Sequence, residues 1–179
     1  DKGMIPPFRF IPLMEEMGFI GALGEWVLRE ACRQMKAFEA QGLMLPKVAV
    51  NVSALQFNSA FIRTVKAVLE ETDLAPAKLE LELTEGVVMA DVNATLEALT
   101  ELKNMGVSLS IDDFGTGYSS LSYLSRFPLD ELKIDRSFVI EFDKSDNDAS
   151  LVIAIIAMAR SLNLRLVAEG EALKKIQSE

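Results

Sequence analysis

The chain has 179 residues, of which half are apolar and a quarter are charged, and this balance is typical of a soluble globular domain. It contains no histidine and a single cysteine, Cys32, so the chain alone cannot form a Ser-His triad, a histidine-ligated zinc site or an internal disulfide. The formal net charge of −9 argues against broad binding to the backbone of nucleic acids. Any catalysis is expected to depend on carboxylates, amides, lysine and metal ions.

No segment of the sequence predicts insertion into a membrane or export. The longest aliphatic run, residues 151–159, is too short to span a bilayer, and no signal peptide is recognisable. We therefore expect a cytoplasmic location, with any membrane anchor outside this segment. Because the chain begins with Asp1 instead of methionine, we also expect it to be a segment of a longer protein.

Apolar residues recur at helical spacing in two segments at the start of the chain, residues 8–18 and 21–42, and Gly42 is a suitable end for the second helix. After these helices, strand-like segments alternate with helix-like segments. The repeat is roughly 30 residues long, the size of a βα unit, and predicts a parallel α/β sheet. The five predicted strands are residues 47–53, 78–85, 107–113, 131–135 and 164–170.

The predicted strands alternate in polarity, although parallel strands covered on both faces usually form continuous aliphatic runs. One face is aliphatic, as at Leu79, Leu81 and Leu83, and is expected to pack against the helices. A closed barrel suits the opposite face because its interior opens at the carboxyl ends of the strands, so we predict an α/β fold with a TIM-like (β/α) barrel. That face carries small or polar side chains: Ala49, Asn51, Glu80, Glu82, Ser108, Ser110, Asp112, Lys133, Asp135, Arg165, Val167 and Glu169.

Hard oxygen donors stand at the carboxyl ends of three predicted strands, at Asn51, Glu82 and Asp112. Such donors suit Mg²⁺ or Mn²⁺, and bound cations would offset the cost of gathering carboxylates in a desolvated cleft. Asp112 and the adjacent Asp113 are candidates to bridge two ions. Two metals about 3.5 to 4 Å apart can stabilise the attacking and leaving oxygens of a phosphoryl displacement, so a phosphodiester is the expected substrate.

Each candidate residue also has a structural explanation that the sequence leaves open. The functional interpretation depends on five strands that end with similar side chains, which independent accidents would rarely produce. The structural alternatives are a turn or cap for Asn51, solvated edge-strand positions for Glu82 and Glu85, a helix cap near residue 119 for Asp112 and Asp113, and an ion pair for Lys133 or Glu169.

Six segments of the chain are distinctive as motifs: "FIPLMEEMG", "GEWVLREACRQ", "VAVNVSALQF", "LELELTEGVVM", "IDDFGTGYSSLSYLSRFPLDELKIDRSFV" and "LVAEG". Together they resemble the EAL-domain family, whose members are cyclic di-GMP phosphodiesterases with a TIM-like barrel. The resemblance extends over residues 7–170, and the motif from Asp112 to Asp135 is highly specific.

The resemblance implies a role for each candidate residue. Lys133 would hold the attacking water or a phosphate oxygen, and Glu85 would anchor the loop after the paired aspartates, residues 114–120. The implied reaction is hydrolysis of one phosphodiester of cyclic di-GMP to linear pGpG, with metal-activated hydroxide as nucleophile. The implied ligands of two Mg²⁺ or Mn²⁺ ions are Asn51 and Glu82 for the first metal, Asp112 for both, and Asp113 and Glu169 for the second, Glu169 directly or through its water.

The resemblance also implies partners. In the family, the loop after the paired aspartates is linked to dimerisation and to metal occupancy. We therefore expect a homodimer through the loop after Asp113 and the neighbouring helices. A sensory or GGDEF domain is expected upstream in the parent protein, and no nucleic-acid partner is expected.

The chain departs from the family pattern at both ends. The Glu-Ala-Leu strand, whose glutamate completes the first metal site, is expected before Asp1, and the last strand of the family is missing. Residues 1–179 are therefore expected to form a single, partial EAL domain with about five of the eight βα units of a TIM barrel. Residues 171–173 do spell Glu-Ala-Leu, but no strand pattern surrounds them. An open sheet would expose its edges and favour association.

Two functional hypotheses follow from these observations. The first is the core of a metal-dependent phosphodiesterase, which the intact set of site residues favours. The second is a non-catalytic EAL-like module that binds cyclic di-GMP or a protein partner, and it depends only on the missing segments. An unrelated barrel enzyme, such as an enolase-like lyase, is disfavoured by "DDFGTGYSS", residues 112–120.

Overall fold

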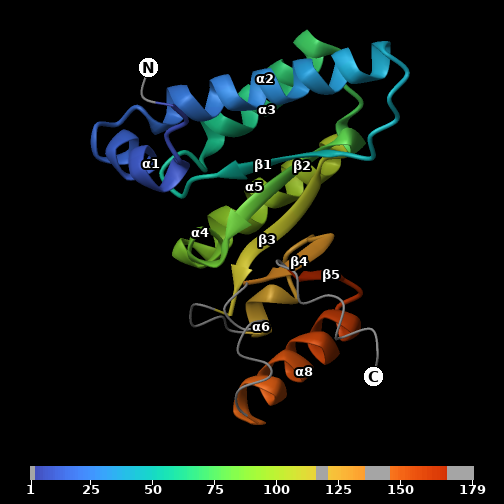
Figure 1. The fold of residues 1–179 in the computed structure, drawn as a ribbon. Helices are drawn as coiled ribbons and strands as arrows, with labels where there is room; N and C mark the ends of the chain where they lie inside the picture. The colour runs from blue at the N-terminus through green and yellow to red at the C-terminus, as the bar shows by residue number, and fades with distance from the viewer. Residues whose placement is uncertain (1–2, 116–120, 136–145, 169–179) are drawn as a thin grey trace.

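The computed structural model describes residues 3–115, 121–135 and 146–168 (Figure 1). Two helices come first, α1 (Pro7–Glu16) and α2 (Ile20–Ala40). The rest of the chain alternates between strands and helices, as the sequence predicts. The elements in order are β1 (Val48–Val52), α3 (Ser59–Thr72), the short 3₁₀ helix η1 (Pro76–Lys78), β2 (Leu79–Thr84), α4 (Glu85–Ala90), α5 (Val92–Met105), β3 (Ser108–Phe114), α6 (Leu121–Leu124), β4 (Glu131–Ile134), α8 (Asp146–Ser161) and β5 (Arg165–Ala168).

The strands form one parallel sheet in the order β1-β2-β3-β4-β5, so each strand pairs with the next one along the chain. This sequential order is the arrangement of strands in a TIM barrel. The predicted TIM-like α/β fold is therefore confirmed, as an open sheet of five strands within the part of the chain that the structure describes.

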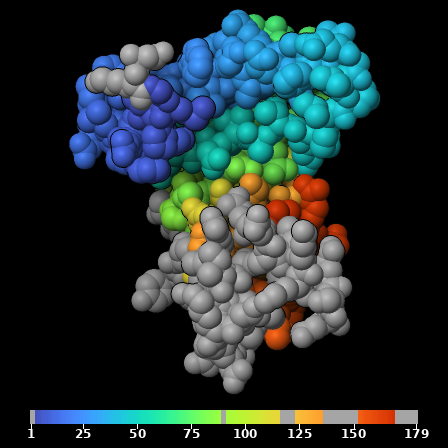
Figure 2. Space-filling model, in the orientation of Figure 1, coloured from blue at the N-terminus to red at the C-terminus, as the bar shows by residue number. Residues whose placement is uncertain are grey.

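The aliphatic face of the sheet packs against the helices. Leu79, Leu81 and Leu83 of β2 are completely buried, and so are Leu109 and Ile111 of β3. Helix α2 contacts β1 and α3, and α5 contacts α3 and β3, so these helices cover one side of the sheet (Figure 1). In the space-filling view, α1, α2 and the segment that follows them, coloured from blue to cyan, form one continuous body (Figure 2). Burial of this face supplies the main hydrophobic contribution to folding.

Helix α2 shows how far spacing alone predicts burial. Leu28, Cys32 and Met35 are buried against the core, but Trp26 is 62% exposed, because it stands two residues before Leu28 and so lies on the opposite side of the helix. Burial raises the pKa of the Cys32 thiol to about 11, because the charged thiolate is poorly solvated there. Cys32 is therefore a core side chain, and its thiol stays protonated at neutral pH.

Helices α3 and α5, which connect β1 to β2 and β2 to β3, begin with side-chain caps. Asn58 Oδ1 accepts hydrogen bonds from the N–H groups of Ala60 (2.9 Å) and Phe61 (3.2 Å) at the start of α3. Asp91 Oδ1 accepts one from the N–H of Ala94 (3.1 Å) at the start of α5. These caps satisfy amide groups that have no partner inside the helix. No helix in the described ranges is both long enough and apolar enough to cross a membrane.

We expect Asn58→Ala to lower the free energy of unfolding by about 1 kcal/mol, because it removes the cap of α3. Urea unfolding followed by circular dichroism measures the change. Asn104→Ala is the matched control, since Asn104 is an exposed residue inside α5 and the substitution there improves helix propensity. Equal losses in the two variants would contradict the capping role.

Candidate active site

The strand register brings the predicted site residues to one end of the sheet. Asn51 of β1 is the register partner of Glu82 in β2, and Thr84 of β2 is the partner of Asp112 in β3. All three candidate ligands therefore stand near the carboxyl ends of adjacent strands. In TIM-like folds this is the end at which active sites are built. Asn51 is exposed, Asp112 is half-buried and Glu82 is only 5% exposed.

A β-bulge lies at the paired aspartates. Ile111 pairs with Leu132, and the next pair is Phe114 with Ile134, so Asp112 and Asp113 together face the single residue Lys133. Asp113 has a positive φ of 53°, which is uncommon for a residue other than glycine but is tolerated by aspartate. The bulge therefore places two consecutive aspartates opposite Lys133 in the strand register.

The bulge also changes which side chains reach the core. By strict alternation, Phe114 would share the polar face with Ser110 and Asp112. Because the bulge adds one residue, Phe114 instead pairs with Ile134 and packs in the hydrophobic core, where it is 5% exposed. Asp112 Oδ1 accepts a hydrogen bond from the Asp113 N–H at 3.0 Å, which stabilises the kinked backbone.

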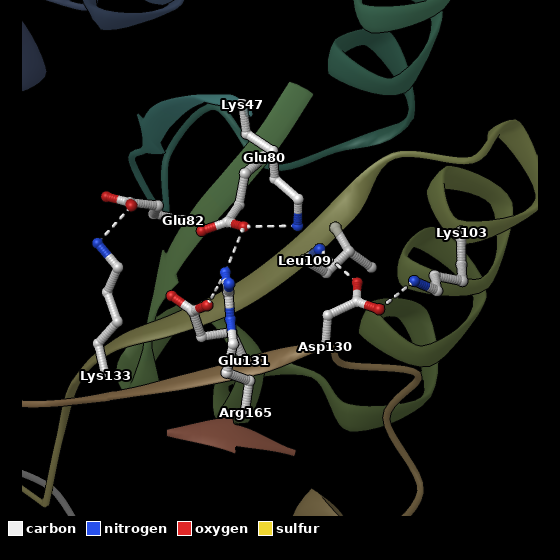
Figure 3. A network of polar contacts seen from close by, with 9 residues as sticks. All are labelled: Lys47, Glu80, Glu82, Lys103, Leu109, Asp130, Glu131, Lys133 and Arg165. Carbon is white, nitrogen blue, oxygen red and sulfur yellow. Dashed lines mark hydrogen bonds and ion pairs between the residues drawn. The ribbon is translucent and has the colours of Figure 1, made fainter. Parts of the chain in front are cut away.

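Glu82 forms an ion pair with Lys133 across the polar face of the sheet. Lys133 Nζ of β4 contacts Glu82 Oε1 of β2 (Figure 3). The pKa of Glu82 is raised, chiefly because the carboxylate is poorly solvated. Lys133 acts in the opposite direction, while the negative charges of Asp112 and Glu80 add to the increase. Glu82 is thus a buried carboxylate whose charge Lys133 partly compensates.

A second set of ion pairs lies on the same face, nearer the amino ends of the strands. Lys47 Nζ is 3.2 Å from Glu80 Oε2, and Arg165 extends from β5 between Glu80 and Glu131 (Figure 3). Glu131 was not among the residues predicted from the sequence, although it stands two residues before Lys133 and so shares its face of β4. Glu80 and Glu131 are buried, and these basic side chains compensate their charge.

Glu85 is buried at the start of α4, directly after β2. Its Oε2 accepts a hydrogen bond from the N–H of Gly115, the residue after β3, at 3.2 Å. The alternative that Glu82 and Glu85 are solvated charges on an edge strand is wrong, because β2 lies between β1 and β3 and both side chains are buried. The contact ties the end of β2 to the chain that leaves β3.

Part of the predicted site cannot be placed. Glu169 and residues 116–120 of the loop lie outside the described residues. Within the ranges that the structure does describe, no three Asp, Glu, Cys or His side chains gather closely enough to hold a metal ion. Glu82 contacts Lys133 instead, and Asp112 Oδ1 accepts the Asp113 N–H.

Comparisons with known proteins agree on one family. A family model described as "EAL domain" matches residues 1–171. The chain is 50% identical over 171 residues to the "Bifunctional diguanylate cyclase/cyclic di-GMP phosphodiesterase MucR" of Pseudomonas aeruginosa, a match that covers 95% of this chain and 25% of that protein. It is 42% identical over 171 residues to the "Cyclic di-GMP phosphodiesterase PdeR" of Escherichia coli, with 95% and 26% covered. The chain thus spans about a quarter of the length of these curated relatives.

The solved structures give the same result. The structure titled "PaMucR Phosphodiesterase, c-di-GMP complex" matches with a TM-score of 0.93 and 47% identity, covering 99% of this chain and 74% of that one. The EAL domain of Mycobacterium smegmatis DcpA matches with a TM-score of 0.79 and 42% identity, covering 88% and 73%. Both solved structures are therefore similar to this chain in sequence as well as in fold.

We expect Asp113→Ala to lower the free energy of unfolding by about 1 to 2 kcal/mol, because alanine is strained at a positive φ. Asp113→Asn should change it by less than about 0.5 kcal/mol, since asparagine tolerates this conformation. Both variants remove the same charge, so urea unfolding without added metal separates backbone strain from electrostatics. Equal losses would contradict the strain explanation.

Proposed function

The chain belongs to the EAL domain family, and on that premise we propose that it carries most of a metal-dependent phosphodiesterase site that hydrolyses cyclic di-GMP to linear pGpG. The observation that carries the proposal is the register of Asn51, Glu82 and Asp112 at one end of the sheet, opposite Lys133. Two curated relatives at 48% and 42% identity are named cyclic di-GMP phosphodiesterases. The non-catalytic alternative is less favoured, since none of the expected residues within the chain is replaced.

The donor set suits a hard divalent cation. Asn51 supplies an amide oxygen, and Glu82, Asp112 and Asp113 supply carboxylates, a combination that prefers Mg²⁺ or Mn²⁺ over softer metals. We propose these four residues and Glu169 as ligands, with Asp112 shared between two ions. When bound, the ions would supply Lewis acidity toward the phosphoryl oxygens and lower the pKa of water.

The remaining roles fall to residues around the ligands. We propose that Lys133 positions a phosphate oxygen or the attacking water, because it faces the two aspartates in the strand register and its ammonium contacts the proposed ligand Glu82. Water adds to phosphorus, the bond from phosphorus to the 3′ oxygen breaks, and that oxygen leaves with a proton. Glu85, through its contact with Gly115, is proposed to anchor the loop that follows the aspartates.

The proposal extends to the wider protein. Residues 1–179 are proposed to form a single, partial EAL domain, since this chain spans 74% of the similar solved chain. We further propose a homodimer through the loop after Asp113 and an upstream sensory or GGDEF domain, as the larger size of the relatives allows. A cytoplasmic location belongs to the proposal because second-messenger nucleotides are degraded inside the cell.

Incubation with cyclic di-GMP and Mg²⁺ should release pGpG from a version of the chain extended at both ends to the length of the similar solved domain. Asp112→Asn should reduce the rate at least about 100-fold, because it removes a charge from the proposed ligand shared by both ions. Asp73→Asn is the matched control, since Asp73 also has a positive φ but lies at the end of α3. Chromatography measures the product. The absence of pGpG with metal present would disprove the phosphodiesterase assignment.

Calcium should compete with magnesium without supporting turnover. Ca²⁺ is larger than Mg²⁺ and adopts less strict coordination, so it should fill the same oxygen site with geometry unsuited to an in-line displacement. Rates of pGpG release measured at fixed Mg²⁺ should fall as Ca²⁺ is added. Equal rates with either ion alone would contradict the two-metal mechanism.

A further inference from the structure

Lys133 forms an ion pair with Glu82, one of the proposed metal ligands. Lys133 Nζ contacts Glu82 Oε1, and both side chains are largely shielded from solvent, with 14% and 6% of their surfaces exposed. The two residues come from strands that are not neighbours in the sheet, β4 and β2, so the lysine crosses β3 to reach the glutamate (Figure 3). The contact therefore places a positive charge on the carboxylate side of the site.

The negative charge of Glu82 is costly at its buried position. A buried carboxylate without a cation is strongly destabilising, and Asp112 and Glu80 add further negative charge around it. A lysine ammonium and a divalent cation both meet this need. Two cations beside the same buried carboxylate repel each other, so the binding of one opposes the binding of the other.

We propose that the Lys133 ammonium holds the Glu82 carboxylate in the metal-free protein, and that cation binding must displace the lysine from this oxygen. The inference builds on the proposed function, in which Glu82 is a metal ligand. Lys133 then has two alternative partners: Glu82 before the cation binds, and substrate or water afterwards. The apparent metal affinity is reduced by the fraction of molecules in which the ion pair is formed.

The pair formed by Lys47 and Glu80 provides a matched control. Glu80 is also a buried glutamate of β2, two residues before Glu82 on the same face, and it also binds one lysine ammonium. Removing Lys47 takes away one positive charge near the site but leaves the Glu82 oxygen in contact with Lys133. A general effect of charge would therefore appear in both lysine variants, whereas displacement would appear in one.

The test measures Mn²⁺ binding by titration calorimetry and electron paramagnetic resonance, without substrate, in the protein extended at both ends. Lys133→Met and Lys133→Gln should bind Mn²⁺ at least about threefold more tightly than the unmodified protein, because no ion pair has to break. Lys47→Met should change the affinity less. The difference should persist from about 0.05 to 0.5 M salt, since screening weakens long-range charge effects more than a direct contact.

Thermal unfolding gives a second readout. Without metal, Lys133→Met should melt at a lower temperature because Glu82 is left without its cation, and Mn²⁺ should raise its melting temperature by more than it raises that of the unmodified protein. Lys133→Gln covers the case in which the methionine variant fails to fold.

The outcomes separate this inference from the phosphodiesterase proposal. Unchanged or weaker Mn²⁺ binding in both Lys133 variants would overturn the displacement, as would equal tightening in Lys47→Met. Release of pGpG by the unmodified protein would still support the enzyme assignment in either case. If the unmodified protein and all the variants fail to bind Mn²⁺, the displacement is wrong and the proposed metal site is wrong with it.

Discussion

The central constraint on this structure is the charge buried on the polar face of its sheet. The opposite face gives the fold its hydrophobic core, since Leu79, Leu81 and Leu83 pack against helices. The same alternation places Glu80 and Glu82 side by side on the polar face, where solvent cannot compensate them. A basic side chain or a bound cation beside each glutamate therefore stabilises its charged form.

The buried glutamates of this face form two sets of ion pairs at different positions along the strands. Nearer the amino ends of the strands, Lys47 and Arg165 form ion pairs with Glu80 and Glu131, and nothing in the proposed chemistry requires these contacts to break. Nearer the carboxyl ends of the strands, Glu82 forms an ion pair with Lys133, a residue with a proposed role in the reaction. In the proposed displacement, only the contact between Lys133 and Glu82 changes, and the ion pairs of Glu80 and Glu131 stay in place.

Much of the fold follows from local sequence patterns. Alternating residues such as Leu79 and Glu80 determine both the strand and its faces, so the five strands, their parallel order and the end of the sheet that carries the site were predictable. The bulge at Asp112 and Asp113 was not, because regular alternation places Phe114 on the polar face instead of in the core. The partner of Glu82 also lay beyond local patterns, since Lys133 is brought to it by strand pairing across β3.

The bulge at Asp112 and Asp113 separates what β3 contributes to the core from what it contributes to the polar face. Deleting either aspartate would restore regular pairing between β3 and β4 and leave Phe114 opposite Ile134 in the core, because one aspartate would then face Lys133 alone. The packing of the strand therefore does not depend on the extra residue. The bulge adds a second carboxylate opposite Lys133 without moving any side chain of the core.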